Sequence, residues 1–220
     1  MFDRELMIML LEGTRDTLYM TLLSTLFGYI LGLPLGIVLT VTDKEGIRPN
    51  AVVYKVLDFI VNLARSIPFL ILLILVIPVT RFIVGKTYGS SATVVPLVIA
   101  AAPFIARMVE SSLKEVDQGV VEAALSMGAG TGTIIWKVLL AEARTSLLVG
   151  VTIALGTILG YSAMAGVVGG GGLGDIAIRY GYYRYQTDIM LLTLVVLVAL
   201  VQIMQGIGTM LSKKLDRRRA

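Results

Sequence analysis

Uncharged runs alternate with short polar stretches along the chain. Residues 17–42, 88–106 and 145–174 contain no charged side chain. A helix of about 20 apolar residues crosses the hydrocarbon core of a bilayer, which is ~30 Å thick. The pattern therefore predicts an all-α polytopic membrane protein, in which residues 1–220 form one domain. Its five transmembrane helices are predicted at about 17–42, 56–80, 88–110, 146–167 and 189–212.

The second predicted span is the least apolar of the five. It contains Asp58, Asn62 and Arg65, and Arg65 lies ten residues beyond Lys55, or roughly 15 Å along a helix. An unpaired charge at this depth is costly and should face protein or water. We expect Arg65 to pair with Asp58 or with an acid of a neighbouring element. Pro68 removes a backbone hydrogen bond, so a kink is predicted there.

Glycine spacing makes two further predictions. Gly28, Gly32 and Gly36 repeat at four-residue spacing, which predicts a helix face that another helix approaches closely. The alternative is that these glycines simply occur in a membrane helix. Residues 169–172 are four consecutive glycines, which predicts unwound backbone at the membrane edge that is free to move. Residues 1–16 mix charged and apolar side chains, and we expect an interfacial N-terminal helix there.

One long polar stretch, residues 114–145, separates the third and fourth spans and is called the polar loop below. Asp117 is suited to cap a first helix. A cluster of glycines beginning at Gly128 ends that helix, and Thr131 or Thr133 is expected to cap a second one. The polar loop is therefore predicted to be a helix, a glycine turn and a second helix.

Composition narrows the classes of function. Hydrophobic residues make up 56% of the chain and charged residues 15%, against roughly 25% charged residues in an average soluble domain. There is no cysteine and no histidine, which excludes disulfides, a thiolate nucleophile, an imidazole base and Cys/His metal sites. We predict no catalytic residue, no metal site and no nucleic-acid binding. Residues 85–87 (GKT) lack the glycine that a phosphate-binding loop needs five residues earlier, where Thr80 stands, so no ATP site is predicted.

Basic residues are divided unevenly between the two sides that five spans define. One side holds Lys44, Arg48, Lys55, Lys114, Lys137, Arg144, Lys213, Lys214, Arg217, Arg218 and Arg219. The other side holds Arg4, Arg15, Arg81, Lys86, Arg179 and Arg184. Because an excess of basic residues marks the cytoplasmic side, we predict an outer N-terminus, a cytoplasmic C-terminus and a cytoplasmic polar loop.

The polar loop resembles a known motif. Glu122-Ala123-Ala124, then Gly128 after three residues, then Val138-Leu139-Leu140 after nine more, is similar to the EAA loop in the permease subunits of prokaryotic ABC importers. In that family the loop docks onto a separate ATP-hydrolysing subunit. The resemblance implies a type I ABC importer permease fold with a cytoplasmic helix-turn-helix coupling loop. The family usually has a proline where this chain has Ala141, and the alternative is an ordinary amphipathic re-entry loop.

Nearly the whole chain resembles the permeases of methionine importers, including RSIPF at residues 65–69, APFIAR at 102–107 and YSAMAG at 161–166. This resemblance implies a non-catalytic subunit in the prokaryotic plasma (inner) membrane that moves L- or D-methionine inward by alternating access. It implies a homodimer, two ATP-binding cassette subunits that bind the ATP and Mg, and an extracytoplasmic methionine-binding lipoprotein. This chain itself would need no cofactor and would contact membrane lipid.

Two sets of candidate residues follow from the resemblance. The ATPase-coupling residues are Glu122, Ala123, Ala124, Gly128, Trp136, Val138 and Leu140. The substrate-pathway residues are Tyr161, Ser162, Met164, Ser66, Pro68 and Arg65. Met164 is suited to touch a thioether through soft contacts, and Arg65 to attract a carboxylate. Ordinary helix packing is the alternative for the pathway residues, and an interfacial anchor is the alternative for Trp136.

Rival functions make different predictions. An ABC permease for another small amino acid or a related thioether would share these features. An ATP-independent secondary transporter or channel would need intramembrane carboxylates and two related halves. The spans hold no deep acid other than Asp58, and no internal repeat is visible. An intramembrane enzyme would need a carboxylate pair or a Ser/Lys pair within the spans, and none is apparent.

Overall fold

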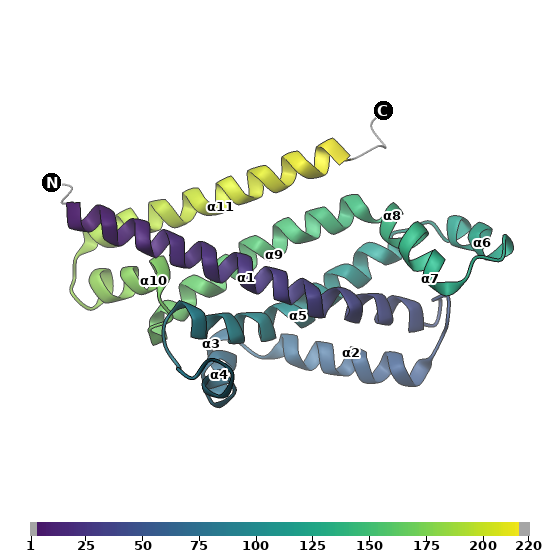
Figure 1. The fold of residues 1–220 in the computed structure, drawn as a ribbon, viewed down its shortest axis with the longest axis horizontal. Helices are drawn as coiled ribbons and strands as arrows, with labels where there is room; N and C mark the ends of the chain where they lie inside the picture. The colour runs from purple at the N-terminus through teal and green to yellow at the C-terminus, as the bar shows by residue number, and fades with distance from the viewer. Residues whose placement is uncertain (1–3, 216–220) are drawn as a thin grey trace.

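Long helices aligned along one axis form the molecule in the computed structural model, which describes residues 4–215 (Figure 1). They are α1 (Arg4–Thr42), α5 (Ser90–Lys114), α9 (Arg144–Ala165) and α11 (Thr187–Leu215). Within these residues all regular structure is helical. Four helical stretches are long and apolar enough to cross a membrane, and a bent helix pair can supply a fifth span. The chain is an all-helical membrane protein, as predicted.

Helix α1 lies directly against α5, and its glycines make this approach possible. Gly28, Gly32 and Gly36 are buried on the face toward α5. A Cβ atom on Gly32 would lie 2.7 Å from the carbonyl oxygen of Ala102, and one on Gly36 would lie 2.6 Å from that of Ala106. The predicted close approach is confirmed, because these glycines carry contacts that no larger residue could make.

The N-terminal part of α1 corrects one expectation. The helix runs unbroken from Arg4 to Thr42, so residues 4–16 form no separate helix, and residues 1–3 lie outside the described part of the chain. This part packs on α10 (Gly172–Ile176). The hydroxyl of Thr17 accepts a hydrogen bond from the backbone N–H of Leu173 at 2.9 Å. The N-terminal turns are therefore the start of one long helix, and one side of them packs on α10.

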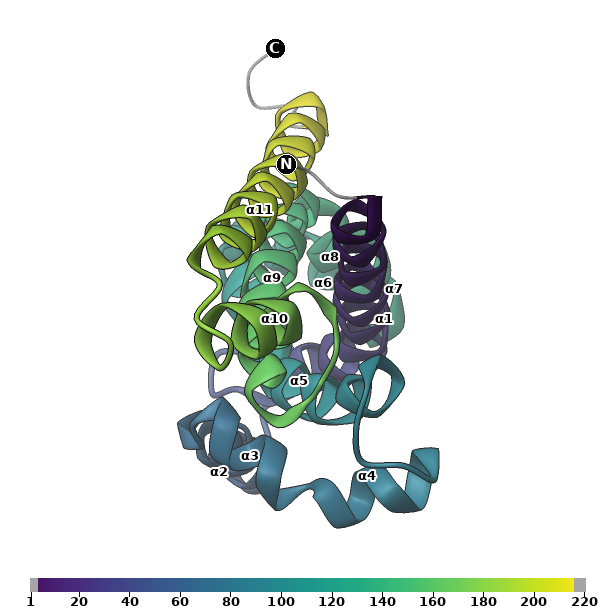
Figure 2. The same cartoon turned by 90° about the vertical axis from the view of Figure 1, so that its left-hand side faces the viewer.

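The second predicted span is broken. It comprises α2 (Ala51–Ser66), α3 (Phe69–Leu75) and α4 (Ile77–Val84), and the axes of α2 and α3 differ by 101°. Ile67, between the first two helices, has extended backbone angles because a residue that precedes a proline avoids the helical region. The kink expected at Pro68 is thus a turn of about a right angle. All three helices lie on the opposite side of the bundle from α11 (Figure 2).

The glycine-rich segment after α9 is unwound, as expected. A 3₁₀ turn (Gly166–Val168) precedes Gly169, Gly171 and Gly172, which all have positive φ angles. Glycine adopts these angles without strain. The freedom of the segment to move stays a prediction, and its backbone is hydrogen-bonded to the chain at the start of α5. Gly89 donates to the carbonyl of Gly169 at 2.9 Å, and the hydroxyl of Thr93 donates to that of Gly170 at 3.0 Å.

The packing of α1 on α5 predicts a selective effect of adding one methyl group. Gly36→Ala places a Cβ atom 2.6 Å from both the Ala106 carbonyl oxygen and the Val109 Cβ. We expect it to lower the free energy of unfolding by about 1–3 kcal/mol, because overpacking forces backbone shifts. SDS-induced unfolding of the purified subunit in mixed micelles measures this. Gly160→Ala is the matched control, since no atom of the described chain lies within 4 Å of its Cβ position. Equal stability of the two variants would contradict the prediction.

Candidate functional site

The polar loop projects at one end of the bundle (Figure 1). It contains α6 (Gln118–Ser126), α7 (Thr131–Thr133), a π-helical stretch (Ile134–Leu139) and α8 (Leu140–Glu142). The helix, glycine turn and helix predicted from the sequence are therefore present. The chain continues in α8 through Ala141, where the resembling family usually has a proline.

Capping of the two helices follows the prediction in one case only. The carboxylate of Asp117 accepts a hydrogen bond from the backbone N–H of Gly119 at 2.7 Å, which confirms it as the cap of α6. Gly128 has a φ of +77° and turns the chain out of α6. Neither expected threonine caps the second helix, because Gly130 occupies the capping position and Thr131 is the first helical residue. The hydroxyl of Thr131 instead accepts a hydrogen bond from Nε of Arg48 at 3.0 Å.

The predicted ATPase-coupling residues divide by exposure. Glu122, Ala123, Gly128 and Trp136 are exposed, whereas Ala124 is buried. The side chains of Val138 and Leu140 are half-buried and pack against the main apolar core. Exposed and buried members of the motif therefore have different surroundings: the first group is available for a partner, and the second holds the loop together.

Apart from Trp136, the large apolar side chains on the surface of the polar loop were not singled out from the sequence. Val120, Leu125 and Met127 are exposed, with Met127 at 81%, and Trp136 is 69% exposed. Helical spacing carried the missing signal, because Val121 and Ala124 take the buried face of α6 and leave its other face outward. Exposed apolar side chains gathered on one small element are typical of a protein-binding surface.

A buried carboxylate joins α5 to its neighbours. Glu110 is 2% exposed and accepts from Arg107 at 2.6 Å, from Lys114 at 2.9 Å and from the hydroxyl of Tyr54 at 3.2 Å. Arg107 also pairs with Asp58 on α2 at 2.5 Å. The pair of Arg107 and Glu110, three residues apart on one face of α5, is thus part of a larger cluster. The spacing of Glu110 and Lys114, four residues apart, was the sequence signal for the second pair.

The cluster continues to the connection between α1 and α2. Lys114 forms an ion pair with Asp43, which follows the last residue of α1. The hydrogen bond from Lys114 holds the pKa of the Asp43 carboxyl below its usual value. Ionised Asp43 therefore stabilises the fold above the unfolded-state pKa of an aspartate, and this contribution is lost as the pH falls through the lowered folded-state value.

The cluster corrects the expectation for Arg65. Asp58 pairs with Arg107, and Asn62 both donates to Asp58 at 3.1 Å and accepts from Arg107 at 2.9 Å. Arg65 itself is exposed and forms no ion pair with any residue among 4–215. Arg65 shares this face of α2, but it lies seven residues, or about two helical turns, beyond Asp58 at the end of α2, and Arg107 already occupies Asp58 and Asn62.

The predicted pathway residues lie in two places. Ser66 and Pro68 are exposed beside Arg65, where α2 ends. The ring of Tyr161 stacks on that of Phe69 with their centroids 4.6 Å apart, which places α9 beside the segment after Pro68. Ser162 and Met164 differ from each other: Met164 is exposed, whereas Ser162 is fully buried and its hydroxyl donates to the carbonyl of Leu159 at 2.7 Å.

Comparison with known proteins gives the class of this protein. The sequence pattern of the family described as binding-protein-dependent transport system inner membrane component matches residues 32–217. The chain belongs to this family and is a multi-pass inner membrane protein.

Individual relatives are similar over nearly their full length. The chain is 52% identical to the probable D-methionine transport system permease protein MetI of Vibrio cholerae, over 96% of this chain and 93% of that protein. It is 44% identical to the methionine import system permease protein MetP of Bacillus subtilis, over 94% and 93% of the two chains. A chain in the solved inward-facing MetNI methionine ABC transporter superposes with a TM-score of 0.97 at 47% identity, covering 98% of this chain and all of that one.

The buried carboxylate predicts a large loss of stability when it is removed. Glu110→Ala leaves Arg107 and Lys114 without the acid that they share, and breaking a buried pair by removing one partner costs on the order of 3 kcal/mol. We expect the midpoint of SDS-induced unfolding to fall accordingly. Glu12→Ala is the control, since Glu12 is exposed on α1. A Glu110→Ala variant as stable as the control would show that the cluster does not stabilise the fold.

Proposed function

We propose that this chain is the membrane-spanning permease subunit of an ATP-driven importer of methionine. The observation that carries the proposal is the capped helix-turn-helix of the polar loop, which exposes Met127 and Trp136 at one end of the bundle. A chain without a phosphate-binding loop of its own needs a separate source of energy, and this surface is suited to bind one. Relatives named for methionine transport, similar over almost the full length, support methionine in its L or D form as the substrate.

The polar loop lies on the cytoplasmic side in this proposal. Helix α11 ends at the same end of the bundle as α6 and α7, whereas α1 begins at the opposite end (Figure 1). Lys213 and Lys214 in the last turn of α11 add to the basic residues at the polar-loop end, and Arg217 to Arg219 lie outside the described residues. The positive-inside rule then gives an outer N-terminus and a cytoplasmic C-terminus. This orientation exposes the polar loop to the compartment that contains ATP.

Two copies of this chain and two ATPase subunits form the working assembly. ATP and Mg bind on the ATPases, and each ATPase holds one polar loop through Glu122, Ala123, Gly128 and Trp136. When the ATPases close on ATP, the two polar loops move together and carry the attached helices with them. The pathway then opens outward, and hydrolysis returns it to the inward-facing state. This is a rigid-body form of alternating access.

The polar face of α2 is an argument for a second copy of the chain and for a polar pathway. Asn62, Arg65 and Ser66 are exposed on the C-terminal half of α2, and Asp58 is partly exposed beside them. Polar groups of this kind are costly in lipid and face protein or a water-filled cavity instead. In the assembly this face lies against the second copy or along the pathway.

Tyr161, Ser162 and Met164 on α9, with Pro68 after α2, complete the substrate path in the proposal. Met164 is exposed in the single chain, so its thioether is available to contact the thioether of the substrate. Buried Ser162 contributes to the packing of α9 beside the path, and its hydroxyl donates to the carbonyl of Leu159. An extracytoplasmic methionine-binding lipoprotein delivers the amino acid to the outer end of the path.

Reconstitution tests the proposed function. The permease, its ATPase and the binding protein are placed in proteoliposomes, and uptake of labelled L- and D-methionine is measured with and without ATP. We expect uptake that requires ATP and exceeds that of leucine or glutamate at least tenfold. Equal uptake without the ATPase under an ion gradient would identify a secondary transporter instead. ATP-dependent uptake that favours another amino acid would retain the class of protein and replace the substrate.

The exposed indole predicts a loss of binding to the ATPase. Trp136→Ala should weaken capture of the ATPase subunit in detergent by about 30-fold, because a tryptophan at the centre of an interface contributes about 2 kcal/mol or more. Tyr182→Ala is the matched control, since Tyr182 is also a largely exposed aromatic residue but lies beyond the other end of α9. If Trp136 is only a membrane-interface anchor, both variants will bind the ATPase as the natural chain does.

A further inference from the structure

The connection between α1 and α2, residues 43–50, is a compact turn that is fixed by backbone hydrogen bonds. The backbone N–H of Gly46 donates to the carbonyl of Asp43 at 2.9 Å, that of Arg48 to Val41 at 3.0 Å, and that of Asn50 to Thr42 at 2.9 Å. The side chain of Asn50 then caps α2. The α1–α2 corner, as we call residues 43–50, is therefore fixed to the ends of both helices.

The α1–α2 corner contacts the polar loop through three different interactions. Arg48 donates from Nε to the hydroxyl of Thr131 at 3.0 Å, across 83 residues of sequence. Asp43 pairs with Lys114, the last residue of α5. Ile47 packs against the apolar core that includes Val121 on α6. The start of α7 and the end of α5 are thus both attached to the α1–α2 corner, which is remote from α7 in sequence.

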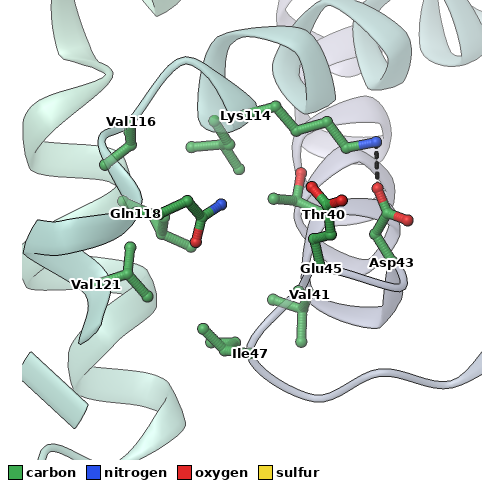
Figure 3. A pocket seen from close by; sticks show the side chains of 12 residues that line it. Thr40, Val41, Asp43, Glu45, Ile47, Lys114, Val116, Gln118 and Val121 are labelled. Atoms are coloured by element: carbon green, nitrogen blue, oxygen red, sulfur yellow. Dashed lines mark ion pairs between the residues drawn. The ribbon is translucent and has the colours of Figure 1, made fainter. Parts of the chain in front are cut away.

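A cavity of about 170 Å³ separates the α1–α2 corner from α6 between these contacts (Figure 3). Gln118 on α6 points into it, toward the side on which Thr40 and Glu45 lie. The two parts are therefore joined at separate points around a cavity and not by continuous packing. The polar contacts of Arg48 and Asp43, together with the packing of Ile47, place the α1–α2 corner against the polar loop.

The ion pair between Asp43 and Lys114 is continuous with the ion-pair cluster around Glu110. From Lys114 the cluster passes to Glu110 and Arg107 on α5, and from Arg107 to Asp58 on α2. Packing of α1 along α5 and the Arg107–Asp58 ion pair connect α1 and α2 to the polar loop indirectly, through α5. The α1–α2 corner adds a direct contact between the polar loop and the ends of α1 and α2, through groups that are charged or hydrogen-bonded.

We propose that the α1–α2 corner is a second attachment of the polar loop, with Arg48 and Thr131 as a pair of positioning residues that transmit its movement to α1 and α2. The inference rests on the proposed function, in which the polar loop is driven by the ATPase. Without this pair the ATPase still binds and hydrolyses ATP. When the ATPase subunits close, however, the polar loop moves relative to the α1–α2 corner, and part of the movement is not transmitted to α1 and α2. Less methionine is then imported for each ATP.

Proteoliposomes with the complete complex test the proposal, by the ratio of methionine imported to ATP hydrolysed. Thr131→Val removes the accepting hydroxyl at nearly constant volume, and Thr131→Ser keeps it. We expect Thr131→Val and Arg48→Ala each to lower the ratio at least threefold with the amount of assembled complex unchanged, and Thr131→Ser to preserve it. The double variant should be no worse than either single one, because both changes remove the same contact.

Other outcomes overturn the proposal. The proposal is refuted if both single variants keep the natural ratio of methionine imported to ATP hydrolysed. It is also refuted if the losses of the two single variants multiply in the double variant, because the two residues would then act separately. Equal losses in Thr131→Val and Thr131→Ser would assign a packing role to Thr131 and also refute the pair.

Hydrogen exchange in the same complex separates this inference from the proposed function. Thr131→Val should raise backbone exchange several-fold at residues 43–50 and in α7, and Thr131→Ser should not. If the natural complex hydrolyses ATP but imports no methionine, the proposed function fails, and the exchange comparison still decides whether the α1–α2 corner is held by this pair. Unchanged exchange in Thr131→Val would refute the attachment whatever the complex transports.

Discussion

The close contact between α1 and α5 is the constraint on which the rest of the structure depends. Three glycines on one face of α1 let its backbone reach the carbonyl groups of α5. In a membrane the hydrophobic effect does not drive helices together, so such close packing supplies much of the attraction. It also sets the axial position of α1, and this position brings the end of α1 beside Lys114 and the polar loop.

This position of α1 brings together the charged residues of the ion-pair cluster, which come from α2, from α5 and from the end of α1. Glu110 alone would be an isolated acid in an apolar setting, and a single buried charge is strongly disfavoured. Arg107, Lys114 and Tyr54 share it, while Asp58 also pairs with Arg107 and Asp43 also pairs with Lys114. Each charge is therefore acceptable only because α1, α2 and α5 are already in place. Such a cluster contributes less to net stability than to fixing a single arrangement of these helices.

The sequence predicted the elements better than their geometry. Runs of uncharged residues located the long helices, because length and hydropathy are local properties, and Asp117 and the repeat of Gly28, Gly32 and Gly36 gave correct local contacts. The right angle after Pro68 was not predictable, because a proline permits a range of bends and packing selects one. The partner of Asp58 was missed for a similar reason: Arg65 is near in sequence, whereas Arg107 is near only after folding. For the candidate site, the motif located the polar loop, but which of its residues face outward depended on the register of α6.

Gly128 shows how a turn in the polar loop can depend on backbone handedness alone. No atom of the described chain lies within 4 Å of the position that its Cβ would take, yet its φ is +77°. An L-residue is disfavoured there by its own backbone and not by a neighbour. A D-alanine introduced by chemical ligation has the mirror-image preference and fits this turn, while L-alanine at the same position strains it. Chirality, and not lack of space, is thus what reserves this position for the one achiral amino acid.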